Sequence, residues 1–113
     1  MNIERIQRAL AYSGGTHTVG DIVDGLLEGR YFYLENEGAS LVFEVIEYPR
    51  KRRIHIFLAA GEMEPVQALR AECEDIARQM GITEVSLLGR KGWERNLAPI
   101  GYKAAHVWLV REL

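Results

Sequence analysis

The fold is decided by residues 53–88, which read RIHIFLAAGEMEPVQALRAECEDIARQMGITEVSLL. Arg53 to Ala60 is a nearly continuous apolar run, which is typical of a central strand covered on both faces. Glu84 to Leu88 is a second, shorter strand-forming run. Because the strand–helix–strand succession has the length of a parallel crossover, we expect these two strands to be parallel neighbours.

The segment between the two strands predicts the longest helix of the chain. It opens between Gly61 and Pro65, and Pro65 lies in the first turn, where its missing N–H costs nothing. Gly81 follows as the residue that ends the helix. One apolar stripe with helical spacing predicts the buried face, and it comprises Val66, Leu69, Cys73, Ile76, Ala77 and Met80.

Two shorter helices precede this unit. Asn2 to Ala11 carries apolar residues on one stripe and ends at the Ser13-Gly14-Gly15 turn. Thr18 followed three residues later by Asp21 forms a weak capping box, so a second helix starts there. Gly29 ends that second helix.

The remaining segments complete a mixed sheet. Tyr31–Leu34 and Leu41–Tyr48 have the composition of strands, Gly92–Leu97 that of a short helix, and Tyr102–Val110 that of a last strand. The predicted order is ααβββαβαβ. This order indicates an α/β (α+β) protein with about five strands and helices on both faces of the sheet.

Length and composition predict a single domain spanning residues 1–113. The chain has 113 residues, 48% of them hydrophobic, and a net charge of −2, so its overall field does not favour nucleic acid. The single cysteine, Cys73, allows no internal disulfide. Since no apolar run reaches the length of about 20 residues that a membrane helix needs, we expect no membrane contact and a location in the cytoplasm.

The sharpest charge feature is the basic connector Arg50-Lys51-Arg52-Arg53. As a functional patch it would bind phosphate, DNA or an acidic protein surface. The alternative is a solvated connector whose charges discourage edge pairing of strands. Arg90, Lys91 and Trp93 form a second candidate interaction corner.

Three histidines are candidate functional residues. His55 and His106 alternate with apolar neighbours in predicted strands, so we interpret both as packing or hydrogen-bonding residues. His17 lies in a loop of small polar residues, which suits either a functional group or a simple turn. No pair of ligands has metal spacing, so no metal site is predicted, and both Trp93 and Trp108 are expected in the core.

The element order and the segment Gly89–Lys103 resemble the GNAT superfamily of acyl-CoA-dependent N-acyltransferases. The step Ile100-Gly101-Tyr102 is similar to the family's Leu-Gly-Phe, which leads into a late strand. The Ser13–Thr18 loop and the Tyr48–Arg52 strand end look like those of small GNAT-like proteins encoded among phage and prophage morphogenesis genes.

This resemblance implies coenzyme A binding where the central strand meets the long helix, here at Leu58, Ala59, Ala60 and Gly61. Active members hold the diphosphate there on a Gly-rich loop. This chain instead has a single Gly, two carboxylates, Glu62 and Glu64, and Pro65, so charge repulsion opposes a diphosphate. In many members of the family, a tyrosine four residues before the Gly of this step protonates the leaving thiolate. The position four residues before Gly101 is occupied by Leu97, so the resemblance assigns no catalytic residue.

We therefore weigh two functions. The first is a non-catalytic phage virion or assembly protein without a cofactor, located in the host cytoplasm or the virion. It would meet other virion proteins, further copies of itself or packaged DNA through the two basic surfaces. The alternative is a small N-acetyltransferase that uses acetyl-CoA on an unknown amine.

Overall fold

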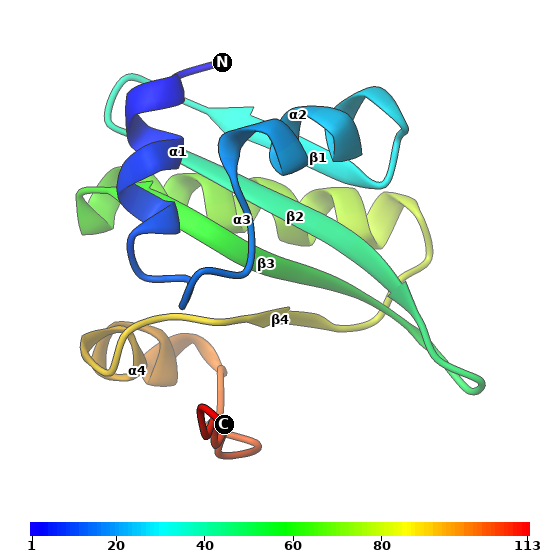
Figure 1. The fold of residues 1–113 in the computed structure, drawn as a ribbon. Coiled ribbons are helices and arrows are strands. Elements are labelled where there is room, and N and C mark those ends of the chain that lie inside the picture. The colour runs from blue at the N-terminus through cyan, green and yellow to red at the C-terminus, as the bar shows by residue number, and fades with distance from the viewer.

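The computed structural model describes all residues 1–113 as one α+β unit (Figure 1). The four strands are β1 (Tyr31–Glu35), β2 (Ala39–Glu47), β3 (Arg52–Gly61) and β4 (Val85–Leu87). The helices are α1 (Ile3–Leu10), α2 (Val19–Leu27), α3 (Met63–Gln79) and α4 (Gly92–Leu97), and a 3₁₀ turn, η1, follows at Ala98–Ile100. None of these helices is long and apolar enough to cross a bilayer.

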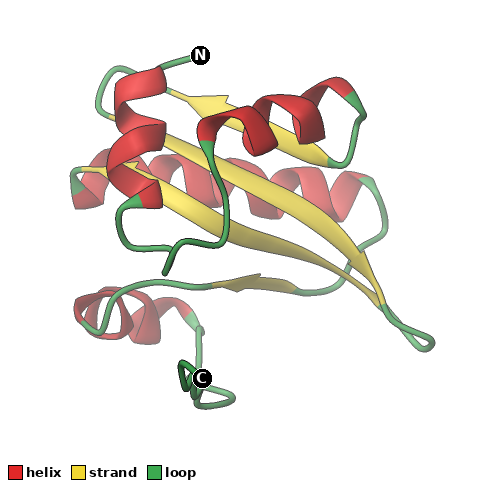
Figure 2. Cartoon of the chain, in the orientation of Figure 1, coloured by secondary structure: helices red, strands yellow, loops and turns green.

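The sheet has the order β1-β2-β3-β4. β1, β2 and β3 pair antiparallel, whereas β3 and β4 pair parallel across α3, which confirms the predicted crossover. α1 and α2 lie on one face of the sheet and α3 on the other (Figure 2). The prediction of helices on both faces is therefore confirmed.

The two faces enclose separate cores. α3 packs against β2 and β3 through Leu69, Cys73 and Ala77, which meet Ile54 and Ile56 of β3. On the opposite face, Ile6 of α1 and Ile22 of α2 meet β2 and β3 through Val42 and Leu58. β3 thus supplies buried side chains to both cores, which explains its nearly continuous apolar sequence.

A β-bulge in β3 makes this double burial possible. Phe43 pairs with Ile56 and Val42 pairs with Leu58, so Phe57 has no partner in β2. Ile54 and Ile56 face α3, whereas both Phe57 and Leu58 belong to the core under α1 and α2. Because Phe57 is one residue more than β2 can pair with, the side chains that follow it in β3 point to the opposite face from the one that regular alternation would give.

The capping box predicted at the start of α2 is present. The Thr18 hydroxyl accepts from the Asp21 amide at 3.2 Å, and the Asp21 carboxylate accepts from the Thr18 amide at 2.8 Å. These hydrogen bonds lower the pKa of Asp21. The carboxylate therefore stays ionised at the helix N-terminus, where negative charge is favourable.

The predicted fifth strand is wrong. Tyr102–Val110 forms no strand, and the sheet has four strands instead of about five. Trp108 and His106, which we expected to pack, are exposed to solvent. Strand composition gives a segment only the capacity to pair, and this segment has no neighbouring strand to supply the hydrogen bonds.

Three layers are tied together at the carboxyl end of β3. The Arg5 guanidinium of α1 donates to the carbonyl oxygens of Asn36 and Ala39, at 2.9 and 3.0 Å, in and beside the β1–β2 turn. The side-chain amide of Asn36 in turn donates from Nδ2 to the backbone carbonyl of Pro65 in α3 at 2.9 Å. The start of α3 is thereby held at a set position beside the end of β3.

Glycine is required at position 61, where the end of β3 lies against the β1–β2 turn. Its φ is 132°, and a Cβ at this position would lie 2.2 Å from the Gly38 carbonyl oxygen. Gly81, after α3, has a φ of 71° but open space around it. A side chain at position 61 would meet both backbone strain and a steric clash, whereas one at position 81 would meet backbone strain alone.

We expect Gly61→Ala to lower the free energy of unfolding by about 3 kcal/mol, because backbone strain and overpacking each cost about 1–3 kcal/mol. Gly81→Ala, which meets strain alone, should cost about 1 kcal/mol. Denaturant unfolding of both variants measures the difference. Equal losses of stability would show that the β1–β2 turn moves away and relieves the clash expected between a Cβ at position 61 and the Gly38 carbonyl oxygen.

Candidate active site

A fork opens between β3 and β4. The two strands pair only over Ile54–Ile56 and Val85–Leu87, and the last bond between them runs from the Leu88 amide to the Ile56 carbonyl at 3.1 Å. β3 continues to Gly61, so its last five residues have a strand neighbour, β2, on one side only. Beyond Leu88 the chain turns toward α4 (Figure 1).

The bulge residue lies where the fork opens, and His17 packs against it. The His17 ring lies 5.4 Å from the Phe57 ring and 6.0 Å from the Tyr31 ring, centroid to centroid. The Thr16 hydroxyl contacts His17 Nδ1 at 2.8 Å, and the Tyr31 hydroxyl contacts Nε2 at 3.2 Å. The loop between α1 and α2 therefore presents an oriented imidazole at the bulge.

A shallow acidic hollow of about 350 Å³ borders this imidazole. Its polar lining comes from α2 and from both ends of that helix: Thr16, His17, Asp21, Asp24, Glu28, Arg30 and Tyr31. Arg30 is paired with Glu28 at 2.7 Å. The other two carboxylates, of Asp21 and Asp24, give this surface a negative charge that favours a cationic ligand.

Arg90 lies in the loop that leaves the fork after β4 and contacts Tyr12. Its guanidinium lies 4.2 Å from the centre of the Tyr12 ring, so the β4–α4 loop touches the α1–α2 loop. Of the other two residues in the predicted interaction corner, Lys91 is exposed and Trp93 packs partly against the α3 core. The Trp93 packing confirms its expected place in the core.

The far end of the fork is the N-terminus of α3. Glu62 is its N-cap residue, but no side chain caps the helix, and the amides of Met63 and Glu64 donate no hydrogen bond. The side chains of Glu62 and Glu64 are exposed. Among the predicted cofactor residues, Leu58 is buried, Ala59 and Ala60 are half-buried, and Gly61 is exposed.

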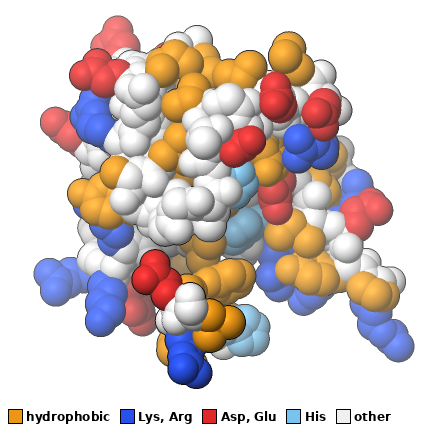
Figure 3. All heavy atoms as spheres, in the orientation of Figure 1, with side chains coloured by type: hydrophobic (Ala, Val, Ile, Leu, Met, Phe, Trp, Pro, Cys, Tyr) orange, Lys and Arg blue, Asp and Glu red, His pale blue; other side chains and the backbone are white.

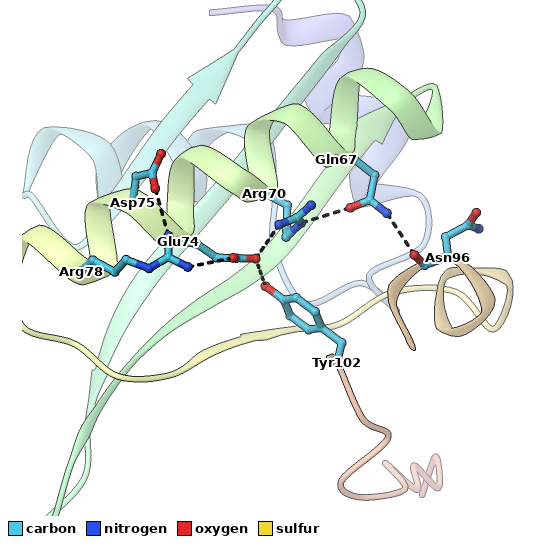
Figure 4. A network of polar contacts seen from close by, with 7 residues as sticks. All are labelled: Gln67, Arg70, Glu74, Asp75, Arg78, Asn96 and Tyr102. Carbon is cyan, nitrogen blue, oxygen red and sulfur yellow. Dashed lines mark hydrogen bonds and ion pairs between the residues drawn. The ribbon is translucent and has the colours of Figure 1, made fainter. Parts of the chain in front are cut away.

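Tyr102 belongs to a polar network along α3 (Figure 4). Its hydroxyl donates to Glu74 Oε2 at 3.0 Å, and Arg70 pairs with the same oxygen at 2.6 Å. Burial, followed by the Glu74 charge, raises the pKa of Tyr102 far above its usual value. Leu97, which occupies the position of the proton-donating tyrosine expected from the GNAT resemblance, is buried and has no proton to donate.

The basic connector is partly tied into the fold but keeps a net positive charge, because a single carboxylate, that of Glu84, faces its four cations. Lys51 and Arg53 both pair with Glu84, the latter at 2.6 Å, and Arg52 donates to the Met80 carbonyl at 2.8 Å. Arg50 alone among the four forms neither an ion pair nor a side-chain hydrogen bond. This hairpin borders a polar hollow of about 400 Å³, lined by Glu47, Tyr48, Arg50, Lys51, Arg52, Gly81 and Thr83.

The remaining candidate groups serve packing. His55 Nδ1 contacts the Ser86 hydroxyl at 2.8 Å, which confirms its hydrogen-bonding role, and burial lowers the pKa of His55. Cys73 is buried in the α3 core, and that burial raises the pKa of its thiol to about 12. No group of three or more His, Cys, Asp or Glu side chains is placed to hold a metal ion.

The sequence motifs did not reveal three parts of this site. These are the bulge at Phe57, the contact of Arg90 with Tyr12, and the aromatic surroundings of His17. Each depends on residues more than ten positions apart, or on strand pairing, so no local pattern reports it. The only available signal was the unusual polar loop around His17.

Several solved structures, among them an acetyltransferase and a predicted acetyltransferase, share this architecture. An acetyltransferase from Trypanosoma brucei superposes with a TM-score of 0.68 at 13% identity, covering 100% of this chain and 96% of that one. A predicted acetyltransferase from Clostridium acetobutylicum, solved with acetyl-CoA, gives 0.66 at 13% identity over 99% and 92%. The protein TTHA1254 from Thermus thermophilus gives 0.64 at 17% identity over 100% and 93%.

These likenesses confirm the GNAT-like fold predicted from the element order. No protein-family model matches the chain, and no curated protein matches it significantly. The structures named above bring no link to a phage particle.

The double pairing of Glu84 predicts a stability that depends on pH. Hydrogen bonds from Lys51 and then Arg53 lower the pKa of Glu84 in the folded state from 4.5. A lowered folded pKa stabilises the protein above pH about 4.5, and this contribution is lost as the pH falls through the folded value. The unfolding free energies of wild type and Glu84→Gln should therefore differ at neutral pH and converge in acid.

Denaturant unfolding at several pH values measures this difference. Glu112→Gln, which removes a carboxylate that forms no ion pair, is the matched control. A gap between wild type and Glu84→Gln that stays constant into acid would contradict the paired arrangement.

Proposed function

We propose that this protein transfers an acyl group from an acyl-CoA thioester, acetyl-CoA in the simplest case, to an amine. The observation that carries the proposal is the fork itself. An unpaired strand edge begins at a bulge and leads to an uncapped helix N-terminus. The shared fold of the acetyltransferases named above supports the same function.

The thioester end of the donor suits the open edge of β3. Phe57–Gly61 has no strand on its β4 side, so this edge can bind an extended amide-containing chain as a sheet binds an added strand. Coenzyme A carries such a chain, with two amides, between its thiol and its diphosphate. Backbone N–H groups near the bulge would also stabilise the oxyanion that forms when an amine attacks the thioester.

The diphosphate of the donor would meet the start of α3. The free amides of Met63 and Glu64 and the helix dipole attract an anion there. The carboxylates of Glu62 and Glu64 repel it, and Pro65 has no N–H to contribute. We therefore expect weak binding of acetyl-CoA, with a dissociation constant near the millimolar range.

The acceptor amine would approach from the acidic hollow. An amine is protonated at neutral pH, so Asp21 and Asp24 attract it, but it must lose a proton before it can attack. His17 lies between this hollow and the bulge, and its two ring nitrogens are held by Thr16 and Tyr31. One of the two hydroxyl contacts must open so that the amine reaches the unprotonated ring nitrogen, and His17 is then the candidate general base.

The non-catalytic assembly function ranks second on this structure. It depended on two surfaces. Glu84 pairs with two of the four charges at Arg50–Arg53, and in the corner of Arg90, Lys91 and Trp93 the Trp93 side chain packs partly against the α3 core. The named structural neighbours bring no evidence for a particle. Binding of a protein or DNA through Arg50, Lys91 and their neighbours remains a prediction.

The donor site predicts a thermal shift that reports binding directly. Acetyl-CoA at ten times its dissociation constant adds about 1.4 kcal/mol to stability and raises the Tm by several degrees. The double variant Glu62→Gln/Glu64→Gln should bind up to about 30-fold more tightly, because each of the two removed charges contributed at most about 1 kcal/mol of repulsion. Its Tm without ligand should fall slightly, since the helix dipole loses two favourable charges.

Scanning fluorimetry with acetyl-CoA up to about 10 mM, ten times a millimolar dissociation constant, measures both effects. Glu72→Gln, which removes an exposed carboxylate further along α3, should leave the ligand shift unchanged. Absence of any shift for wild type and for the double variant would rule out the donor site at the start of α3.

Replacement of His17 by Gln should lower kcat/KM for acyl transfer about 100-fold or more, as expected for loss of a general base. Release of coenzyme A thiol from acetyl-CoA, with a small diamine as acceptor, is a direct assay. Cys73 contributes little background because its thiol is buried. His106→Gln is the control in the exposed C-terminal segment, and wild-type rates for His17→Gln would exclude a role for that imidazole.

A further inference from the structure

The C-terminal segment exposes a continuous apolar run. Val107, Trp108, Leu109 and Val110 are between 78% and 87% exposed. Residues 103–113 form no helix, no strand and no hydrogen bond with the rest of the chain. Figure 3 shows hydrophobic side chains facing solvent at the bottom of the view, where Figure 1 places the C-terminus.

This run has the composition of a buried strand. Its β-branched and aromatic residues favour strand pairing, and four consecutive apolar residues suit a strand covered on both faces. A soluble protein rarely leaves such a patch open, because large exposed apolar patches mark interaction surfaces. The segment therefore has strand character without a strand neighbour.

The same chain carries a sheet edge without a neighbour. β4 ends the sheet, and its outer side pairs with no strand. Val85, Ser86 and Leu87 are all only half-buried, in contrast to the alternating buried residues of β3. Val85 and Leu87 pack at the border of the α3 core, as does the half-buried Ile76, so an added strand would extend that core.

The path of the chain leads the segment away from its own β4. Gly101 adopts a φ of 98°, and the Tyr102 hydroxyl is bonded to Glu74 of α3. After Tyr102 the chain descends away from the sheet (Figure 4). The segment is thus anchored at its start and projects from the molecule beyond that point.

We propose that two copies of this chain form a symmetric dimer in which residues 106–110 of each copy add as a strand to the β4 edge of the other. The outer side of β1 also has no strand neighbour, but the edge at β4 borders the α3 core that an added apolar strand would extend. Each copy then offers one such edge and one unused strand, so a twofold arrangement satisfies both and closes. The exchange also removes two exposed edges, which otherwise promote uncontrolled association. Such a dimer does not depend on acyl transfer.

The area available is sufficient for a stable dimer. A buried Trp contributes about 150–250 Å², and each aliphatic side chain contributes about 60–120 Å² by the transfer energies of such groups. Two exchanged segments and the surfaces that they cover then bury about 1,300–2,400 Å². This value reaches the range of about 1,200–2,000 Å² found for specific interfaces.

Size-exclusion chromatography with light scattering tests the dimer on the full chain. Wild type should have twice the monomer mass of 12.8 kDa. Trp108→Ser/Leu109→Ser and, independently, Val107→Glu should be monomeric at the same concentration, with unchanged circular dichroism. Leu27→Ser, which removes an equally exposed leucine at the end of α2, should remain dimeric.

Amide hydrogen exchange identifies the strand that pairs. In the dimer, the amides of residues 106–110 and of β4 should be protected, and both should lose protection in the monomeric variants. A monomeric wild type overturns the proposal, including one whose C-terminal amides are protected by pairing within its own chain. A dimer that survives the C-terminal substitutions, or an assembly larger than two copies, overturns it as well.

Discussion

Burial of β3 on both faces is the constraint on which the rest of the structure depends. A strand in this position needs apolar side chains on both sides, with α3 on one face and α1 and α2 on the other. The bulge at Phe57 reconciles this need with the pairing to β2. It also coincides with the point where β4 leaves β3, so the feature that distributes the core also opens the candidate site.

The end of β3 pairs with β2 alone, and polar contacts hold the elements around it. Arg5 binds the carbonyl groups in and beside the β1–β2 turn, and the turn binds the first residues of α3. The helix N-terminus can therefore remain uncapped and solvent-facing without moving, because the anchoring contacts come from behind it. Such an arrangement leaves amides free for a ligand, while Glu62 and Glu64 set how strongly an anion binds.

Charges in this protein act mainly in local groups. Glu84 pairs with both Lys51 and Arg53, and Glu74 accepts from Arg70 and Tyr102. In contrast, two carboxylates of the hollow beside His17, those of Asp21 and Asp24, have no cation paired with them. The net charge of −2 thus conceals a hairpin that keeps a net positive charge and an acidic hollow beside His17, and the hollow is the electrostatic candidate for a cationic ligand.

The sequence by itself determined the helices, the first four strands, the parallel crossover and the burial of Cys73, because hydrophobic period and helix caps are local properties of the chain. It also marked His17 as an unusual loop residue. It failed at residues 102–110, where strand composition was mistaken for a strand. Only the tertiary structure decided the bulge at Phe57, the Arg5 contacts, the Glu84 pairs and the placement of His17 beside Phe57. Strand pairing, ion pairing and ring packing each join residues distant in sequence, so their outcome depends on which edges and charges meet when the layers assemble.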